Sequence, residues 1–226
     1  MDLITKALEE GQSMLSEHES KLFLQSYGIP VTREKEVSNK EALLEAIQNI
    51  GYPLVIKGCG SDLSHKTERN LVHLDIRSQD EALGAFDVIY GEVEKEGGTV
   101  LVQEMVKGTR ELVMGLTRDR QFGPCVMFGL GGIFTEILKD ISFRVAPLER
   151  REAREMMMEI KARKILEALR GLPPANMDEL ADVLIALGTI GLERKAVKEI
   201  DLNPVILNGE HPVAVDALVV LDQKET

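Results

Sequence analysis

The spacing of apolar residues along the chain predicts alternating helices and strands. Residues 40–50 carry leucines and isoleucines three or four positions apart, as on one face of a helix. Residues 71–76 alternate between apolar and polar, as a half-buried strand does. The same criteria predict further helices at about 3–10, 16–27, 78–96, 149–160 and 178–190, and further strands at 31–37, 54–57, 100–106, 111–116, 124–130, 197–202 and 213–221.

Turn and capping residues divide these elements into two groups. Ser16 and Glu19 form the ends of a capping box, and Ser38 or Asn39 is expected to cap the next helix. The pair Gly97-Gly98 then separates a first lobe, at about 17–97, from a second, at about 98–222, within one domain over 1–226. Strands and helices in this order predict an α+β fold of two α/β lobes rather than a doubly wound parallel sheet.

Composition narrows the possible ligands. The net charge is −11, and aromatic residues make up only 4% of the chain, with no tryptophan. Such a chain repels nucleic acids and anionic membranes and offers few rings for stacking bases. The two cysteines are too few for a disulfide framework, and no apolar run approaches the length of a membrane helix. We therefore expect a cytoplasmic protein without nucleic-acid or membrane partners.

Two segments have features of phosphate-binding sites. Lys57 ends an apolar strand and is followed by Gly58, so its ammonium can be aimed at a phosphate. The segment 129–132 holds three glycines, among them Gly131 and Gly132, whose N–H groups can surround an anion. It matches neither a Rossmann fingerprint nor a Walker A loop. A surface lysine and a plain tight turn are the structural alternatives.

Two acids flank the link between two predicted strands. Glu104 and Glu111 can accept hydrogen bonds from ribose hydroxyls, and the link between them, including Val106 and Lys107, can offer main-chain groups to an adenine edge. Two solvent-facing acids are the alternative interpretation.

Oxygen donors gather near the carboxyl end of the chain. Asp201 and Asn203 would share one face of a strand, because side chains alternate. If 204–212 forms a hairpin, Asp216 on the following strand lies opposite Asn203. Hard oxygen ligands suit Mg²⁺, although Asn203-Pro204 is also ordinary turn chemistry.

A histidine completes the set of candidates. His65 lies in the polar loop 58–70 that follows the Lys57 strand, and a neutral imidazole can act as a nucleophile toward phosphorus. A histidine in a polar loop most often has no such role, so its position alone does not decide the matter.

Taken in order, these motifs resemble those of a known family. The runs are Leu54–Lys57, Leu63–Thr67, Gln103–Met105 with Arg110-Glu111, Phe128–Phe134 and Glu199–Pro204. From about Leu15 to Leu221 the chain resembles the ATP-grasp subunit of ADP-forming acyl-CoA synthetases, whose relatives include the β subunit of succinyl-CoA synthetase. Glu68 departs from the family's usual Asp after the His-Lys-Thr triplet, conservatively in charge.

The resemblance implies a role for each candidate. Lys57, with Gly58 and the Gly131-Gly132 turn, would bind ATP or ADP phosphates, and Arg144 would lie near them. The segment from Glu104 through Val106 and Lys107 would hold adenine, and Glu111 the ribose. Asn203 and Asp216, with Asp201, would bind Mg²⁺. His65 would be a phosphorylated relay.

It also implies a reaction and a partner. The reaction would interconvert acyl-CoA, ADP and phosphate with a carboxylic acid, ATP and CoA. We find no dinucleotide-type CoA-binding domain in the sequence, so a separate CoA-binding α subunit is expected in a hetero-oligomer. Two other functions stay open: an ATP-grasp carboxylate ligase without phosphohistidine, and a non-catalytic nucleotide-binding regulatory module.

Overall fold

The computed structural model describes residues 2–60, 71–132, 140–169 and 171–223. The helices are α1 (Leu3–Glu9), α2 (Glu17–Gln25), α3 (Lys40–Ile50), α4 (Gln79–Val93), α6 (Arg150–Glu159) and α7 (Met177–Glu193), with short 3-10 turns at Glu94–Glu96 and Arg163–Leu166. The strands are β1 (Glu34–Val37), β2 (Leu54–Cys59), β3 (Val72–Ile76), β4 (Thr99–Glu104), β5 (Glu111–Asp119), β6 (Gly123–Leu130), β7 (Ile141–Val145), β8 (Val197–Asn208), β9 (His211–Ala214) and β10 (Ala217–Leu221).

The chain forms two compact units. The small unit comprises residues 16–19 and 32–105, and the large unit comprises 1–15, 20–31 and 106–226. Each unit is built around its own sheet and its own apolar core. No helix in the described part of the chain is long and apolar enough to span a membrane.

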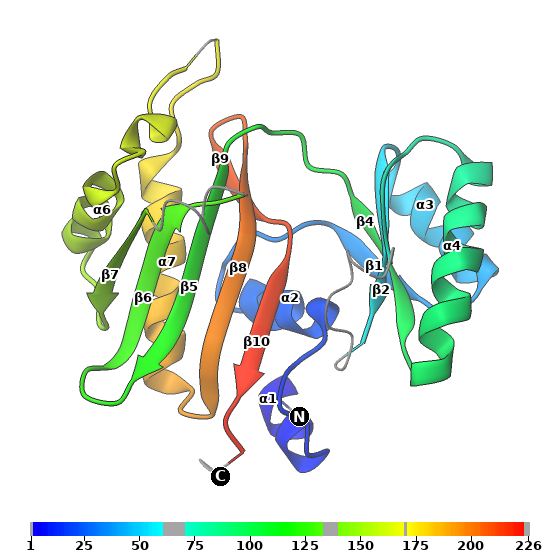
Figure 1. Cartoon of the computed structure of the whole chain (residues 1–226), viewed down its shortest axis with the longest axis horizontal. Helices are drawn as coiled ribbons and strands as arrows, with labels where there is room; N and C mark the ends of the chain where they lie inside the picture. Colours follow the sequence, from blue (N-terminus) through cyan, green and yellow to red (C-terminus); the bar gives the residue numbers. More distant parts are fainter. Residues whose placement is uncertain (1, 61–70, 133–139, 170, 224–226) are drawn as a thin grey trace. The chain divides into compact units, whose positions relative to one another are not determined.

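The small unit holds a four-stranded sheet in the order β1-β4-β2-β3, with α3 and α4 on one face (Figure 1). Leu54 and Ile56 of β2 face these helices, together with Leu43 of α3 and Ile89 of α4. Asn39 caps α3 by accepting from the Ala42 N–H, which confirms one of the two predicted caps. The neighbouring residues of β2, including Lys57, therefore point to the opposite face.

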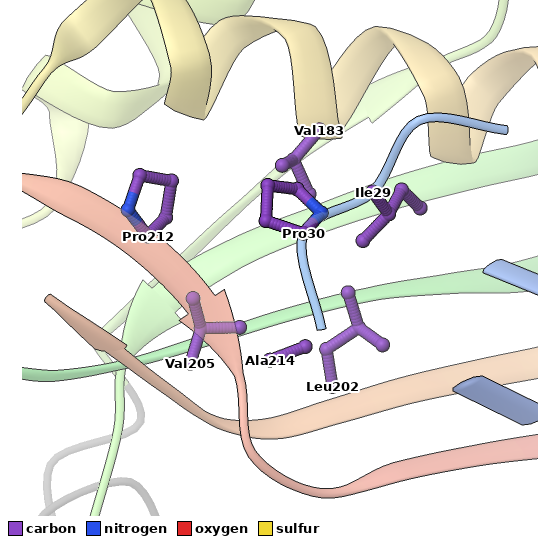
Figure 2. A pocket seen from close by; sticks show the side chains of 7 residues that line it. All are labelled: Ile29, Pro30, Val183, Leu202, Val205, Pro212 and Ala214. Carbon is purple, nitrogen blue, oxygen red and sulfur yellow. The ribbon is translucent and has the colours of Figure 1, made fainter. Parts of the chain in front are cut away.

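The large unit holds a six-stranded antiparallel sheet in the order β10-β8-β5-β6-β7, with β9 paired to β8 (Figure 1). Helices α6 and α7 pack against one face, which we call the helix-covered face. Leu202 and Val205 of β8 point to this side, where they line a small apolar gap (Figure 2). The gap is lined by Ile29, Pro30, Val183, Leu202, Val205, Pro212 and Ala214. With no charged side chain in its lining, it does not suit a nucleotide.

The structure corrects the predicted boundary between the lobes. Strand β4 was expected to open the second lobe, but it lies between β1 and β2 in the small unit, which ends at Met105. Residues 100–103 of β4 are buried, as in a central strand flanked on both sides. The glycines at 97 and 98 therefore mark a turn within one sheet rather than a domain boundary.

Three strand predictions also change. Strand β8 runs on to Asn208 instead of ending at Leu202, and the predicted strand at 213–221 is divided into β9 and β10 by a bend at 215–216. Strand β7, at the edge of the large sheet, was not predicted. Its sequence Ile-Ser-Phe-Arg-Val does alternate, but only over five residues.

Candidate functional site

The candidate residues are divided between the two units. The small unit carries Lys57, Gly58 and Glu104. The large unit carries the others that the structure describes, which are Val106, Lys107, Glu111, Gly131, Gly132, Arg144, Asp201, Asn203 and Asp216. His65 lies outside the described residues.

The three metal candidates are brought together on the large sheet. Ala217 pairs with Leu202, and the Val215 N–H donates to the Pro204 carbonyl at 3.0 Å. These two contacts lie on either side of Asp216 and place it opposite Asn203, as expected. Because Leu202 points to the helix-covered face, Asp201 and Asn203 point to the other side, which we call the acidic face.

The carboxylates on this face interact electrostatically. Burial raises the pKa of Asp201 to about 6, with smaller contributions from the charges of Glu199 and Asp216. Asp216 also accepts a hydrogen bond from the Ala217 N–H at 2.8 Å. A site where carboxylates repel each other and are partly desolvated favours a cation.

The donor set fits Mg²⁺ in chemistry. Asp201 and Asp216 supply carboxylate oxygens and Asn203 an amide oxygen, the hard ligands that Mg²⁺ prefers. Among the described residues, no three acidic, histidine or cysteine side chains form a metal-binding group. Mg²⁺ usually takes only one or two protein carboxylates and completes its shell with phosphate oxygens and water, so this donor set suits a metal that arrives with a nucleotide.

The glycine turn packs on the start of β5. The Gly131 N–H donates to the Glu111 carbonyl at 2.8 Å. Gly132 has a φ of +71°, and a Cβ at this position would lie 2.7 Å from Oε2 of Glu111. Both glycines are therefore needed for the turn to approach β5. The structure thus brings Glu111, Gly131 and Gly132 into one cluster.

The link between β4 and β5 is held on the large sheet by a buried arginine. Arg110 is 3% exposed and donates to the carbonyls of Ile165, Glu167 and Gly209. Its own carbonyl accepts from the Leu207 N–H. Sequence reasoning noted Arg110 only as a neighbour of Glu111, since a buried cation bound by carbonyl groups leaves no pattern in the sequence. Val106 and Lys107 lie in this link, and Lys107 is exposed.

Glu104 is occupied by another contact. Its carboxylate accepts from the main-chain N–H of Arg33 at 2.9 Å and from the Arg33 Nε at 2.8 Å. The Glu104 N–H in turn donates to the Arg33 carbonyl. In this structure the side chain of Glu104 ties the end of β4 to the residue before β1, so its predicted contact with a nucleotide gains no support from the geometry.

Arg144 does not join the metal candidates. On β7 it pairs with Val126 of β6, whose side chain is in the core, so Arg144 lies on the helix-covered side of the sheet. There its guanidinium binds both oxygens of Glu159 on α6. The acidic face is on the other side of the same sheet, which places Arg144 apart from Asp201 and Asn203. The predicted phosphate contact therefore has no geometric support.

Lys57 is buried in an ion pair. The side chain emerges from the centre of the small sheet, where only 4% of the residue is exposed, and its Nζ lies 2.5 Å from Oε1 of Glu17. Gly58 donates its N–H to the Leu71 carbonyl. Sequence reasoning placed Glu17 in a capping box and missed this pairing, because the two residues are 40 positions apart.

Comparison with known proteins decides the family. The family model described as "ATP-grasp domain" matches residues 6–221. The chain belongs to the ATP-grasp family. The predicted α+β ATP-grasp fold is thereby confirmed.

Individual relatives agree with this assignment. The β subunit of acetate–CoA ligase [ADP-forming] I from Pyrococcus furiosus is 41% identical over 225 residues, and the match covers 97% of each chain. The acetate–CoA ligase [ADP-forming] I of Archaeoglobus fulgidus is 40% identical over 229 residues, covering 99% of this chain but only 33% of that one.

A solved structure of acetyl-coenzyme A synthetase 1 from Ca. Korarchaeum cryptofilum is similar over 98% of this ATP-grasp chain and 99% of its own. Its TM-score is 0.87, with 42% identity. That protein was solved with coenzyme A and Mg-AMPPCP, with its phosphohistidine segment pointing towards the nucleotide binding site.

Proposed function

We propose that this ATP-grasp chain is the nucleotide-binding subunit of an ADP-forming acyl-CoA synthetase. The enzyme interconverts acyl-CoA, ADP and phosphate with a carboxylic acid, ATP and CoA. The observation that carries the proposal is the near-complete, 41% identical match to a β subunit of this enzyme class. The resemblance of the His65 loop and the glycine turn to the same class points in the same direction.

Several of the predicted residues would serve the nucleotide. Lys57 would supply a cation to the phosphates, and the cluster of Glu111, Gly131 and Gly132 would supply a ribose acceptor and main-chain N–H groups. Asn203 and Asp216, with Asp201, would hold Mg²⁺, which neutralises phosphate charge when bound. Phosphoryl transfer depends mostly on positioning and charge, and these residues provide both.

His65 would carry the phosphoryl group between this site and the partner. In one step the P–O bond of an acyl phosphate breaks, a P–N bond to the imidazole forms, and the carboxylic acid leaves. In the next step a β-phosphate oxygen of ADP attacks phosphorus, the P–N bond breaks, and ATP forms. The phosphohistidine segment of the Korarchaeum protein supports this role by analogy.

A CoA-binding α subunit would complete the enzyme. The Pyrococcus relative is named a β subunit, and the Archaeoglobus relative is about three times as long as the matched region. Purification of the chain from its native source, with identification of bound proteins by mass, tests this proposal. A CoA-binding partner is expected, and a chain that purifies alone would contradict it.

The relay is tested by phosphoryl labelling. The chain is incubated with Mg²⁺ and ATP labelled at the γ-phosphate, with His65→Ala as the test variant and His73→Ala, on β3, as the control. We expect an acid-labile, base-stable label on the wild type and the control, and none on His65→Ala. Equal labelling of His65→Ala would refute the relay. Absence of label from all three, with amine-dependent release of ADP, would instead identify a carboxylate ligase.

A further inference from the structure

The ion pair between Lys57 and Glu17 is more deeply buried than a phosphate-binding lysine requires. Both residues are 4% exposed, and the Nζ–Oε1 distance is 2.5 Å. Lys57 lies on β2, a strand that is buried along its whole length. A buried ammonium is stable only with a close counter-charge, and here the Glu17 carboxylate provides one.

Glu17 is itself fixed by local structure. The Ser16 hydroxyl accepts from the Glu19 N–H at 3.2 Å, and the Glu19 carboxylate accepts from the Ser16 N–H at 3.0 Å. This capping box sets the start of α2 at Glu17, and a carboxylate is stabilised at a helix N-terminus. The chain thus places the counter-charge on a rigid element rather than on a loop.

We propose that Glu17 is a positioning residue that holds the Lys57 ammonium aimed for nucleotide binding. An ammonium has three donor hydrogens, so it can bond to Glu17 and to other acceptors at the same time. This inference rests on the proposed function, which assigns Lys57 to the phosphates.

Two effects of Glu17 oppose each other. Its negative charge repels phosphate, so its removal could strengthen nucleotide binding. Its removal also takes from the buried Lys57 the carboxylate that lies 2.5 Å away, which favours movement of the side chain toward water. The loss of the ion pair acts at 2.5 Å in a desolvated site. The repulsion acts on a phosphate that lies farther away, beyond the ammonium, so we expect the removal of Glu17 to weaken nucleotide binding overall.

A double-mutant cycle tests the proposal on the full chain. The dissociation constant of Mg-ADP is measured by calorimetry for wild type, Glu17→Gln, Lys57→Met and the double variant. The control is Glu41→Gln, which removes the same charge from the first turn of α3 in the same unit, where the residue is exposed. We expect each single variant to bind about tenfold more weakly or worse, a loss of about 1.4 kcal/mol or more. The double variant should bind no more weakly than Lys57→Met.

The outcomes separate the inference from the proposed function. If Lys57→Met binds like wild type, the assignment of Lys57 to the phosphates fails. If Lys57→Met is weak but Glu17→Gln matches Glu41→Gln, the positioning role is overturned while the function stands. Additive losses in the double variant would show that Glu17 acts independently of Lys57, which also overturns the role.

Folding is checked by circular dichroism for every variant. Should Glu17→Gln fail to fold, Glu17→Asp takes its place, because it keeps the charge and shortens the side chain by one methylene. It must still bind Mg-ADP more weakly than the Glu41→Gln control. Equal binding by Glu17→Asp would overturn the proposal.

Discussion

Asp201 offers a stability test of the acidic face that needs no assay of turnover. Its pKa of about 6 lies roughly two pH units above the usual 3.8, mainly because the side chain is desolvated in the folded chain. A carboxyl with a raised pKa holds its proton more tightly when folded, so its ionised form destabilises the fold. The destabilisation is absent below about pH 4, grows up to about pH 6, and is complete above it.

The magnitude follows from the size of the pKa difference. About two pH units correspond to about 3 kcal/mol at most, at 1.36 kcal/mol for each. Since part of the side chain is in contact with solvent, we expect about 1–3 kcal/mol. Asp201→Asn keeps the shape and cannot ionise, so its free energy of unfolding should exceed that of wild type by this amount at pH 8 and by little at pH 4.

Equilibrium urea unfolding of the full chain at the two pH values measures the difference. Glu199→Gln removes one of the charges that raise the pKa of Asp201 and should give a smaller gain with the same pH dependence. Glu45→Gln, an exposed change on α3, should give no gain at either pH. The reasoning is wrong if Asp201→Asn is destabilising at pH 8, or if its gain is as large at pH 4 as at pH 8.

Three further changes probe other parts of the structure. Gly132→Ala should weaken Mg-ADP binding in calorimetry and lower the urea midpoint, because its φ is +71° and the new methyl would meet the carboxylate of Glu111; unchanged binding would separate the turn from the nucleotide site. Arg144→Ala should leave the KM for ADP unchanged in the assembled enzyme, since the Arg144 guanidinium binds Glu159 on the helix-covered side. A KM raised several-fold would instead support a contact between Arg144 and the phosphates. Asn39→Ala should cost about 1 kcal/mol in urea unfolding through loss of the α3 cap, and no loss would show that the cap is replaced by water.

Local rules predicted most of the elements but not their grouping into units. The cap at Asn39 and the capping box at Ser16 depend on residues three positions apart, and both form as expected. The position of β4 depends on pairing with β1 and β2, at least 40 residues away along the chain, and the glycines at 97 and 98 suggested a boundary that long-range pairing overrides.

In the candidate site, too, local features were predicted and long-range contacts were not. Asp201, Asn203 and Asp216 come together because strand alternation and a hairpin register fix them locally. Arg144 was selected by the family resemblance, yet the period-two alternation of β7 decides which side of the sheet it occupies. That strand had not been predicted, so its side could not be assigned. The pairing of Glu17 with Lys57 is a tertiary contact between the start of a helix and a central strand, which no sequence periodicity encodes.

The raised pKa of Asp201 and the fit of its neighbours to Mg²⁺ have one physical cause. Partial burial beside Glu199 and Asp216 makes a further negative charge on Asp201 unfavourable, and the same low dielectric strengthens attraction to a divalent cation. A bound cation would therefore lower the pKa of Asp201, and by linkage proton release should accompany Mg-ADP binding near pH 6. Calorimetry of wild type in two buffers of different ionisation enthalpy would detect these protons. The Asp201→Asn variant should release fewer protons on binding Mg-ADP. Equal proton release by the two proteins would show that the pKa of Asp201 does not respond to the bound metal.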